Sequence, residues 1–431
     1  MAMDSVSAWR SRIEPPQIEA AVSVMLAQGW LSDRAPAVIA HDMDRLGARL
    51  GRLRALFPSS ALHAVAIKAN PVVPILAAVV DAGCGLEAAS WEEVQLAVAA
   101  GCPPAQIVYD SPAKTRTDLA AALKLGVHIN ADNLDELDRL ATLGAGPEAS
   151  VGLRLNPALD GGTIATTSVA NRGSRFGLPW PDSVPSLVQP FERYPWLTGL
   201  HVHVGSQGCP VSLLVEAARR VVELRAAIHT ALGRPTITTL DIGGGLPAEY
   251  GAASPGVELD DYVSMLRAQV PALFEPDLRI VTEMGRALQV GCGFVVSRVE
   301  YVKRVAERSL ATLHVGADLL LRTAYAPTDW PHEVLVLDAH GRLKSGPVEP
   351  WTLVGPLCFA GDVIARDRSL PAVEEGDLVV VRDVGGYTLG MWSRHCSRGA
   401  PAVVGLRGTP PRLEPLRPAE TSDDIVRSWG G

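Results

Sequence analysis

The sequence predicts an α/β protein in which a (β/α)8 barrel is followed by an antiparallel β domain. Short apolar runs alternate with helix-period stretches up to Glu283, which is the rhythm of repeated βα units. Beyond Glu283, strand-like runs follow one another without long helices between them. The length of 431 residues has room for a barrel and a second domain.

The apolar runs before Glu283 are the expected barrel strands. They cover residues 63–67, 85–89, 106–109, 127–130, 150–155, 198–204, 236–242 and 278–283. Apolar residues three and four apart predict amphipathic helices over residues 90–101, 115–126, 133–144 and 209–233. Eight such units close into a barrel, and a doubly wound open sheet is the alternative.

The runs of the second domain predict an antiparallel sheet. They cover residues 294–305, 309–315, 332–338, 350–355 and 377–384, and a polar, Pro-rich tail follows Gly408. We expect the barrel to span residues 35–285 and the β domain to span residues 286–431, with residues 1–34 as a candidate addition to the β domain. The strand-like run at 35–42 could join the β domain or precede the barrel, and the sequence leaves this open.

Charge and composition exclude several kinds of partner. The chain has 39 Lys and Arg against 47 Asp and Glu, a formal net charge of −8 that argues against nucleic acid and anionic membranes. No apolar run approaches the roughly 18 residues of a membrane span, and the N-terminus lacks a secretory pattern, so we expect a cytoplasmic protein. The six cysteines form no CxxC pair, which argues against a zinc site and favours free thiols.

The chain has only five lysines, so there are few candidates for a reactive amine. Lys68 ends the first expected barrel strand, at the C-terminal mouth where barrel active sites lie. A partly desolvated lysine there has a lowered pKa and can form a Schiff base, whereas the alternative is a lysine that merely reaches from the strand end to solvent. The other lysines are expected to be solvated: Lys114, Lys124, Lys303 and Lys344.

Three further motifs are expected near the same mouth. The glycine run within residues 241–247 offers backbone N–H groups that can hold a phosphate, or it forms an ordinary tight turn. His201 and His203 share one strand face, either in the site or as hydrogen-bonded core residues. Glu283 and Arg286 follow the last strand, as site residues or as a local ion pair.

Two loops of the expected β domain carry candidate residues as well. Cys358 and Asp362 lie between two strand-like runs, where the plainer alternative for the cysteine is a buried free thiol. Tyr387 follows a pair of glycines and is either a core aromatic or a phosphate donor.

Taken in order, these motifs resemble those of the pyridoxal-phosphate-dependent decarboxylases of fold type III, which share the alanine-racemase type of fold. The motifs are VAIKANP, LEAASWEE, SRFGL, HVHVGSQ, DIGGGLP, EMGR, GPLCFAGDVI and GGYTLGMWS. The resemblance is nearest to the diaminopimelate and ornithine/arginine decarboxylases and runs from about residue 35 to residue 406. It implies the alanine-racemase-type barrel with a second β domain, pyridoxal 5′-phosphate as cofactor and an amino acid as small-molecule substrate.

The resemblance also implies the roles of single residues. Lys68 matches the lysine that binds the cofactor, His203 the imidazole that stacks on the pyridine ring, and Glu283 the acid that keeps the ring nitrogen protonated. The other cofactor-contacting positions are matched by Ser206, Gly243, Gly244, Gly245, Gly285, Arg286 and Tyr387. Alanine racemases have an arginine in place of Glu283, so this residue favours decarboxylation.

Cys358 matches a cysteine that reaches across a dimer interface and helps to protonate the carbanion after CO2 leaves. The resemblance therefore implies a homodimer with shared active sites. Asp362 belongs to the same loop and to its substrate side.

The chain departs from the family pattern around the substrate. Diaminopimelate decarboxylases have an acid directly after the loop cysteine to hold the distal ammonium, and here that position is Phe359. His395 and Cys396 replace an expected Tyr-Asn, and Arg322 loosely matches an arginine that binds a distal carboxylate. These departures predict decarboxylation of an unusual or conjugated amino acid that lacks a distal ammonium. The alternatives are diaminopimelate decarboxylase proper, a racemase or epimerase with Cys358 or His395 as second base, and a non-catalytic cofactor carrier.

Overall fold

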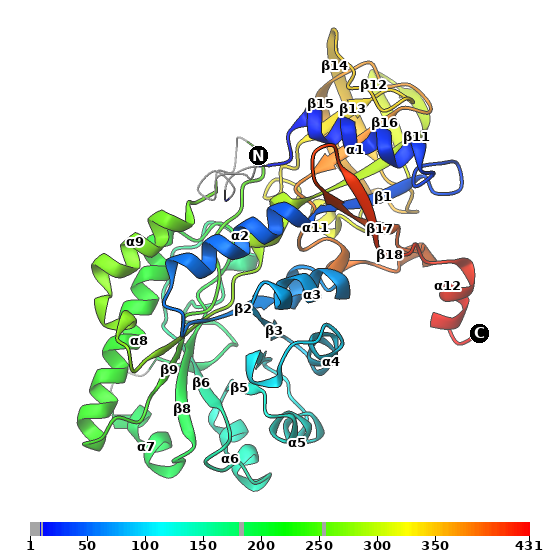
Figure 1. Ribbon diagram of the computed structural model, residues 1–431. Helices are drawn as coiled ribbons and strands as arrows, with labels where there is room; N and C mark the ends of the chain where they lie inside the picture. Colours follow the sequence, from blue (N-terminus) through cyan, green and yellow to red (C-terminus); the bar gives the residue numbers. More distant parts are fainter. Residues whose placement is uncertain (1–8, 10–11, 181–184, 252–255) are drawn as a thin grey trace. The chain divides into compact units, whose positions relative to one another are not determined.

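The computed structural model describes residue 9 and residues 12–180, 185–251 and 256–431, which form two compact units (Figure 1). Of these residues, the first unit contains 9, 47–180, 185–247 and 257–287, and the second contains 12–46, 248–251, 256 and 288–431. The unit boundaries differ from the expected 35–285 because residues 37–42 pair with strands of the second unit.

The sheet of the first unit is a closed parallel barrel. Its strands, in the order in which they pair, are β2 (Leu62–Ala66), β3 (Gly85–Ala88), β4 (Ile107–Asp110), β5 (His128–Ala131), β6 (Val151–Asn156), β8 (Leu197–Val202), β9 (Thr239–Asp241) and β10 (Arg279–Thr282). Parallel pairing of β10 with β2 closes the ring, and the short β7 (Leu178–Pro179) lies beside β6. All the expected barrel strands are confirmed, and the doubly wound alternative is wrong.

One helix precedes the first barrel strand, the others follow barrel strands, and together they lie around the barrel (Figure 1). They are α2 (Met43–Leu56), α3 (Val73–Asp81), α4 (Trp91–Ala99), α5 (Arg116–Leu125), α6 (Leu134–Thr142), α7 (Pro185–Arg193), α8 (Val211–Leu232), α9 (Leu259–Gln269) and α10 (Arg286–Gln289). The four predicted helices correspond to α4, α5, α6 and α8. Ser90, Thr115 and Asn133 start three of them by accepting a backbone N–H at the N-cap.

The second unit is built on a largely antiparallel sheet. Its strands are β1 (Ala37–Asp42), β11 (Gly293–Val305), β12 (Arg308–Leu313), β13 (Val334–Leu337), β14 (Val348–Val354), β15 (Val363–Pro371), β16 (Leu378–Arg382), β17 (Ala402–Arg407) and β18 (Arg412–Arg417). The pairs β1–β17 and β12–β14 are parallel. Its helices are α1 (Pro15–Ala27), α11 (Leu321–Tyr325) and α12 (Ser422–Ser428).

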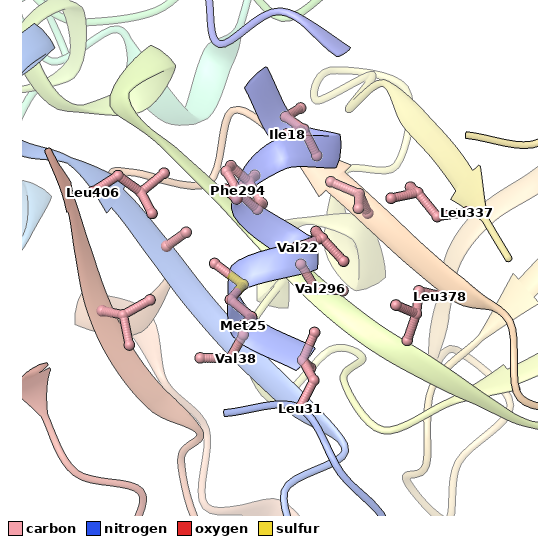
Figure 2. Close-up of a cluster of buried hydrophobic side chains, with 14 of the residues drawn as sticks. Ile18, Val22, Met25, Leu31, Val38, Phe294, Val296, Leu337, Leu378 and Leu406 are labelled. Atoms are coloured by element: carbon pink, nitrogen blue, oxygen red, sulfur yellow. The ribbon is translucent and has the colours of Figure 1, made fainter. Parts of the chain in front are cut away.

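The opening segment belongs to the second unit. Strand β1 lies between β11 and β17, and α1 buries Ile18, Val22 and Met25 against the sheet (Figure 2). Two elements also occupy the region after Gly408, where only a polar tail was predicted. Pro415 lies in β18, a strand at the sheet edge beside a register shift, which are the places where sheets tolerate proline.

Short 3-10 helices complete the described elements. They are η1 (Ile67–Ala69), η2 (Pro104–Gln106), η3 (Ala165–Thr167), η4 (Pro271–Phe274), η5 (Val290–Cys292), η6 (Leu389–Met391) and η7 (His395–Ser397). Among the helices of the described ranges, none is long and apolar enough to cross a bilayer. All six cysteines are free, as expected, and four of them are buried.

Candidate active site

Lys68 lies directly after β2, in the single turn of η1 between the buried Ile67 and Ala69. Its Nζ contacts both carboxylate oxygens of Glu87, at 2.7 and 2.6 Å. Glu87 comes from the neighbouring strand β3, and its side chain is fully buried while that of Lys68 is 41% exposed. The amine therefore combines a fixed position at the strand end with access from outside.

Glu87 is a candidate site residue that the sequence analysis did not single out. Burial raises its pKa to about 8, although the charge of Lys68 opposes the shift. An acid that titrates near neutral pH can exchange a proton with the adjacent amine. The signal in the sequence was a glutamate inside an otherwise apolar barrel-strand run, at the strand next to that of Lys68.

Lys114 contradicts the prediction that the other lysines are solvated. Its side chain is fully buried and its Nζ pairs with Glu136 at 2.6 Å. The same Nζ donates to the carbonyl oxygens of Ser111 and Asn130, each at 2.8 Å. These partners come from helix α6, the loop after β4 and strand β5, so the burial depends on the fold and not on the local sequence. The remaining lysines are partly buried or exposed: Lys124, Lys303 and Lys344.

The glycine run after β9 packs closely against two other candidate residues. Gly243 and Gly245 have positive φ angles of 67° and 105°. A Cβ on Gly243 would collide with the His203 ring, and one on Gly244 would collide with the backbone of Glu283. The run therefore requires glycine for its shape and its close packing, and it brings the ends of β8, β9 and β10 together.

His203 is held as a neutral imidazole. The backbone N–H of Gly244 donates to its Nδ1 at 3.1 Å, so the ring proton is on Nε2. Burial lowers the pKa of His203 to about 3. A neutral, fixed aromatic ring is suited to stack on another planar ring.

Ser206 and Arg286 form one polar pair in the first unit. The Arg286 Nε donates to the Ser206 Oγ at 2.8 Å. Arg286 is the first residue of α10 and is almost fully buried. A guanidinium and a hydroxyl in contact offer the donors that a phosphate group needs.

Glu283 carries a buried carboxylate at the end of β10. Its Oε2 lies 3.5 Å from the Nε2 of His201. Its Oε1 is buried and has no hydrogen-bond partner among the described residues. An unsatisfied buried carboxylate oxygen is costly, so this atom marks the place of a missing donor.

The candidates of the second unit form two contacts. The guanidinium of Arg322, in α11, lies 4.2 Å from the centre of the Trp330 ring and 4.8 Å from that of Tyr387. Phe359 and His395 meet edge to face with ring centres 5.7 Å apart, and both side chains are exposed.

Cys358 and Asp362, which share a loop of the second unit, differ in accessibility. Cys358 is exposed, so its thiol is not the buried one that the plainer alternative predicted. The carboxylate of Asp362 is buried and accepts the backbone N–H groups of Ala317 and Leu357, each at 2.6 Å. Asp362 therefore holds the backbone of the loop that carries Cys358.

The barrel residues fit pyridoxal 5′-phosphate, the cofactor that the motif resemblance implies. The unsatisfied Oε1 of Glu283 suits a protonated ring nitrogen, and the neutral ring of His203 suits stacking on the pyridine. The accessible amine of Lys68 suits a covalent bond to the aldehyde carbon.

Comparisons with known proteins agree with this fit. Residues 43–290 match the family model of the pyridoxal-dependent decarboxylase, pyridoxal binding domain. The chain is 32% identical to diaminopimelate decarboxylase from Pseudomonas aeruginosa, over 84% of each chain. It is also 32% identical to diaminopimelate decarboxylase from Actinosynnema pretiosum, over 90% of this chain and 87% of the relative.

Solved structures show the same architecture. Diaminopimelate decarboxylase from Helicobacter pylori, complexed with L-lysine, superposes with a TM-score of 0.83 at 25% identity, over 94% of this chain and 98% of that one. Together with the family model and the relatives, this similarity shows that the chain belongs to the pyridoxal-phosphate-dependent amino-acid decarboxylases of fold type III.

Proposed function

We propose that this chain decarboxylates diaminopimelate, with pyridoxal 5′-phosphate bound at Lys68. The observation that carries the proposal is the similarity to several diaminopimelate decarboxylases over more than four fifths of the chain. The accessible amine of Lys68 and the unsatisfied oxygen of Glu283 support the same chemistry.

Each barrel residue has a role in this proposal. Lys68 holds the cofactor, Glu283 bonds its ring nitrogen and His203 stacks on its ring. When bound, pyridoxal phosphate supplies the electron sink for the pair left on Cα as CO2 leaves. The phosphate is held by Ser206, Gly243, Gly244, Gly245, Gly285 and Arg286, and the motif resemblance adds Tyr387 to this set.

Residues of the second unit act on the substrate side. Arg322 binds a distal carboxylate, and its contact with the rings of Trp330 and Tyr387 limits the positions that the guanidinium can take. Cys358, which is exposed, delivers the proton to Cα after CO2 has left. Asp362 keeps the Cys358 loop in shape.

A second candidate substrate is an amino acid without a distal ammonium, of an unusual or conjugated kind. The specific observation in its favour is the Phe359–His395 contact, which puts an aromatic ring where the family has an acid. An ammonium that loses its water against that ring costs several kcal/mol, and a cation–π contact returns only roughly 0.5–2 kcal/mol.

A substrate screen separates the two candidates. CO2 release is measured from diaminopimelate, lysine, ornithine and acylated amino acids, with chiral analysis of the recovered substrate to detect racemisation. A kcat/KM for diaminopimelate of about 10⁴ M⁻¹s⁻¹ or more supports the first candidate. Efficient turnover restricted to compounds without a distal ammonium supports the second. Racemisation without CO2 release overturns both and indicates the racemase alternative.

Phe359 allows a direct test of specificity. If the native substrate lacks a distal ammonium, Phe359→Glu improves turnover of diaminopimelate and impairs the native reaction, because a desolvated carboxylate then faces a group that cannot pair with it. Phe359→Leu is the matched control, since it removes the ring without adding charge. Equal effects of both variants on all substrates would show that position 359 does not select the distal group.

We further propose a homodimer with shared active sites, because Cys358 matches the family cysteine that reaches across a dimer interface, while Lys68 belongs to the other unit of the chain. Mixed dimers of the inactive variants Lys68→Ala and Cys358→Ala then regain activity, since one site of each mixed dimer has both wild-type residues. Confirmed subunit exchange without recovered activity would contradict the shared site.

We also propose that the reaction takes place in the cytoplasm. All six cysteines are free, and free thiols persist in a reducing compartment. Fractionation of the producing cells tests this location, and recovery of the enzyme from an oxidising compartment would contradict it.

A further inference from the structure

A row of buried charged side chains crosses the barrel and ends at Glu283. Arg154 from β6 donates to Asp110 from β4 at 2.7 Å. His201 from β8 lies between two acids, with its Nδ1 3.9 Å from Asp110 and its Nε2 3.5 Å from Glu283. We call Arg154, Asp110, His201 and Glu283 the charge row. All four side chains are at most 8% exposed.

The charges of the row alternate if His201 carries a proton on both ring nitrogens. Neither nitrogen of His201 forms a hydrogen bond with a described residue, and each lies within 4 Å of one carboxylate of the row. Positive and negative groups then follow one another from Arg154 to Glu283. A buried ion pair is tolerated where each charge has an opposite neighbour, and the row meets this condition.

Two buried titratable groups beside the row, Asp241 and His128, do not supply a cation to Glu283. Asp241, in β9, accepts hydrogen bonds from Asn130 and from the backbone of Gly243. His128, in β5, bonds Ser150 and Asn130, and burial lowers its pKa to about 4. Burial also disfavours a charge on His201, but the carboxylates of Glu283, Asp241 and Asp110 outweigh it and raise its pKa to about 9.

Three further titratable groups bear on the row: Lys68 after β2, Glu87 in β3 and His203 directly after β8. The charge of Lys68 also favours the ionised form of Glu283, but less than that of His201. Lys68 and Glu87 pair with each other at 2.6 Å. His203 is neutral because a backbone N–H donates to it. The two histidines of the HVHVGSQ motif therefore differ in charge, although only one residue separates them.

We propose that His201 is a positioning residue that acts through Glu283 on the cofactor. As an imidazolium, it keeps Glu283 ionised and pairs with the Oε2 atom of Glu283. The Oε1 atom of Glu283 then remains available to the ring nitrogen of pyridoxal phosphate. This inference rests on the proposed function and extends it to a residue that does not touch the cofactor.

The physical reason is the proton balance at the ring nitrogen. Burial alone favours the neutral acid form of Glu283. A neutral acid would keep its proton and only donate a hydrogen bond to the lone pair of the ring nitrogen, which would leave the ring uncharged. With His201 charged beside it, Glu283 stays a carboxylate, and the proton stays on the ring nitrogen, where it strengthens the electron sink.

The test compares holoenzymes of the wild type, His201→Gln and His63→Gln. His63 is the matched control: it is a buried barrel histidine that bonds the hydroxyl of Thr282, the residue before Glu283, and burial lowers its pKa to about 4. Each protein is loaded with ¹⁵N-labelled pyridoxal phosphate, and the chemical shift of the ring nitrogen is measured. We expect a protonated nitrogen in the wild type and in His63→Gln, and an unprotonated one in His201→Gln.

Binding of a cofactor analogue gives a second readout. In this analogue, a CH group replaces the ring nitrogen of pyridoxal phosphate. We expect His201→Gln to weaken the affinity for pyridoxal phosphate by about tenfold or more, as for the loss of one charge-assisted contact, and to leave the affinity for the analogue unchanged. An equal loss for both compounds would show a merely structural role and overturn the inference.

A neutron structure of the wild-type holoenzyme at neutral pH needs no variant. Deuterium on both ring nitrogens of His201 supports the inference, and deuterium on one nitrogen only overturns it. Failure of the proposed function can be distinguished from failure of the role of His201. If the wild type does not bind pyridoxal phosphate at Lys68, the proposed function fails. If it does, but the ring nitrogen is equally protonated in His201→Gln, only the role of His201 fails.

Discussion

The barrel contains two lysine–glutamate pairs with the same 2.6 Å contact and opposite surroundings. In the pair after β2, the Lys68 side chain is 41% exposed and Glu87 is fully buried. In the pair after β4, Lys114 is fully buried, pairs with Glu136 and donates to the backbone carbonyl oxygens of Ser111 and Asn130. The two lysines therefore differ in accessibility: Lys68 can be reached from outside the protein, while Lys114 is enclosed by fixed acceptors and is suited to a structural role.

The largest expected effect is the loss of activity in Lys68→Ala. We expect CO2 release to fall by at least about 10³-fold, because no other amine takes over the covalent bond to the cofactor. The fold should persist, since burial already raises the pKa of Glu87 to about 8 and the acid can take up a proton when its partner is removed. Activity assays measure the loss of CO2 release, and circular dichroism shows whether the fold persists. The exposed Lys124→Ala is the control. Activity above a tenth of the wild type would show that Lys68 is not the cofactor lysine.

Lys114→Met is expected to act on stability instead. Removing this lysine leaves Glu136 buried without its partner, which costs about 3–5 kcal/mol of unfolding free energy. Urea unfolding of the cofactor-free protein measures the loss. The exposed Lys124→Met should change stability by less than about 0.5 kcal/mol. The double variant Lys114→Met/Glu136→Leu should recover part of the loss, and no recovery would mean that the pair is not the source of the stability.

The smallest expected effect is the pH dependence that Glu87 adds. Its pKa is raised from 4.5 to about 8 in the folded protein, so its contribution to stability is present below pH 4.5 and is lost as the pH rises through 8. The melting temperature of the cofactor-free wild type should therefore fall, relative to Glu87→Gln, by a few degrees over this range. If the melting temperatures of the two proteins change with pH in the same way across this range, the raised pKa of Glu87 is contradicted.

The sequence predicted that Lys68 lies at the end of a barrel strand, but it did not predict that Lys114 is buried. Apolar runs of barrel length predicted β2 and its C-terminal end, and the amine follows directly. Lys114 was wrongly expected to be solvated because its acceptor Asn130 is 16 residues away and comes beside it only when β4 and β5 pair. The sequence around Lys114, at the start of a predicted helix, does not show that Asn130 will lie close to it.

The charge row had a signal in the sequence that the pattern analysis did not use. Asp110, Arg154 and His201 each interrupt an apolar run that forms a barrel strand. A charged group in such a run must meet an opposite charge from another strand. Which strand supplies it depends on closure of the barrel. Likewise, β1 pairs with β17, more than 350 residues along the chain, and no local pattern could assign the opening segment to the second sheet.

Reductive trapping of the holoenzyme tests the central claim most directly. Borohydride reduces the bond between the cofactor and its lysine to a stable amine, and peptide mapping by mass spectrometry then locates the modified residue. The accessible Lys68 should carry the pyridoxyl group, and the buried Lys114 should remain unmodified. A pyridoxyl group on Lys114, or on any lysine other than Lys68, would contradict the assignment of the active site.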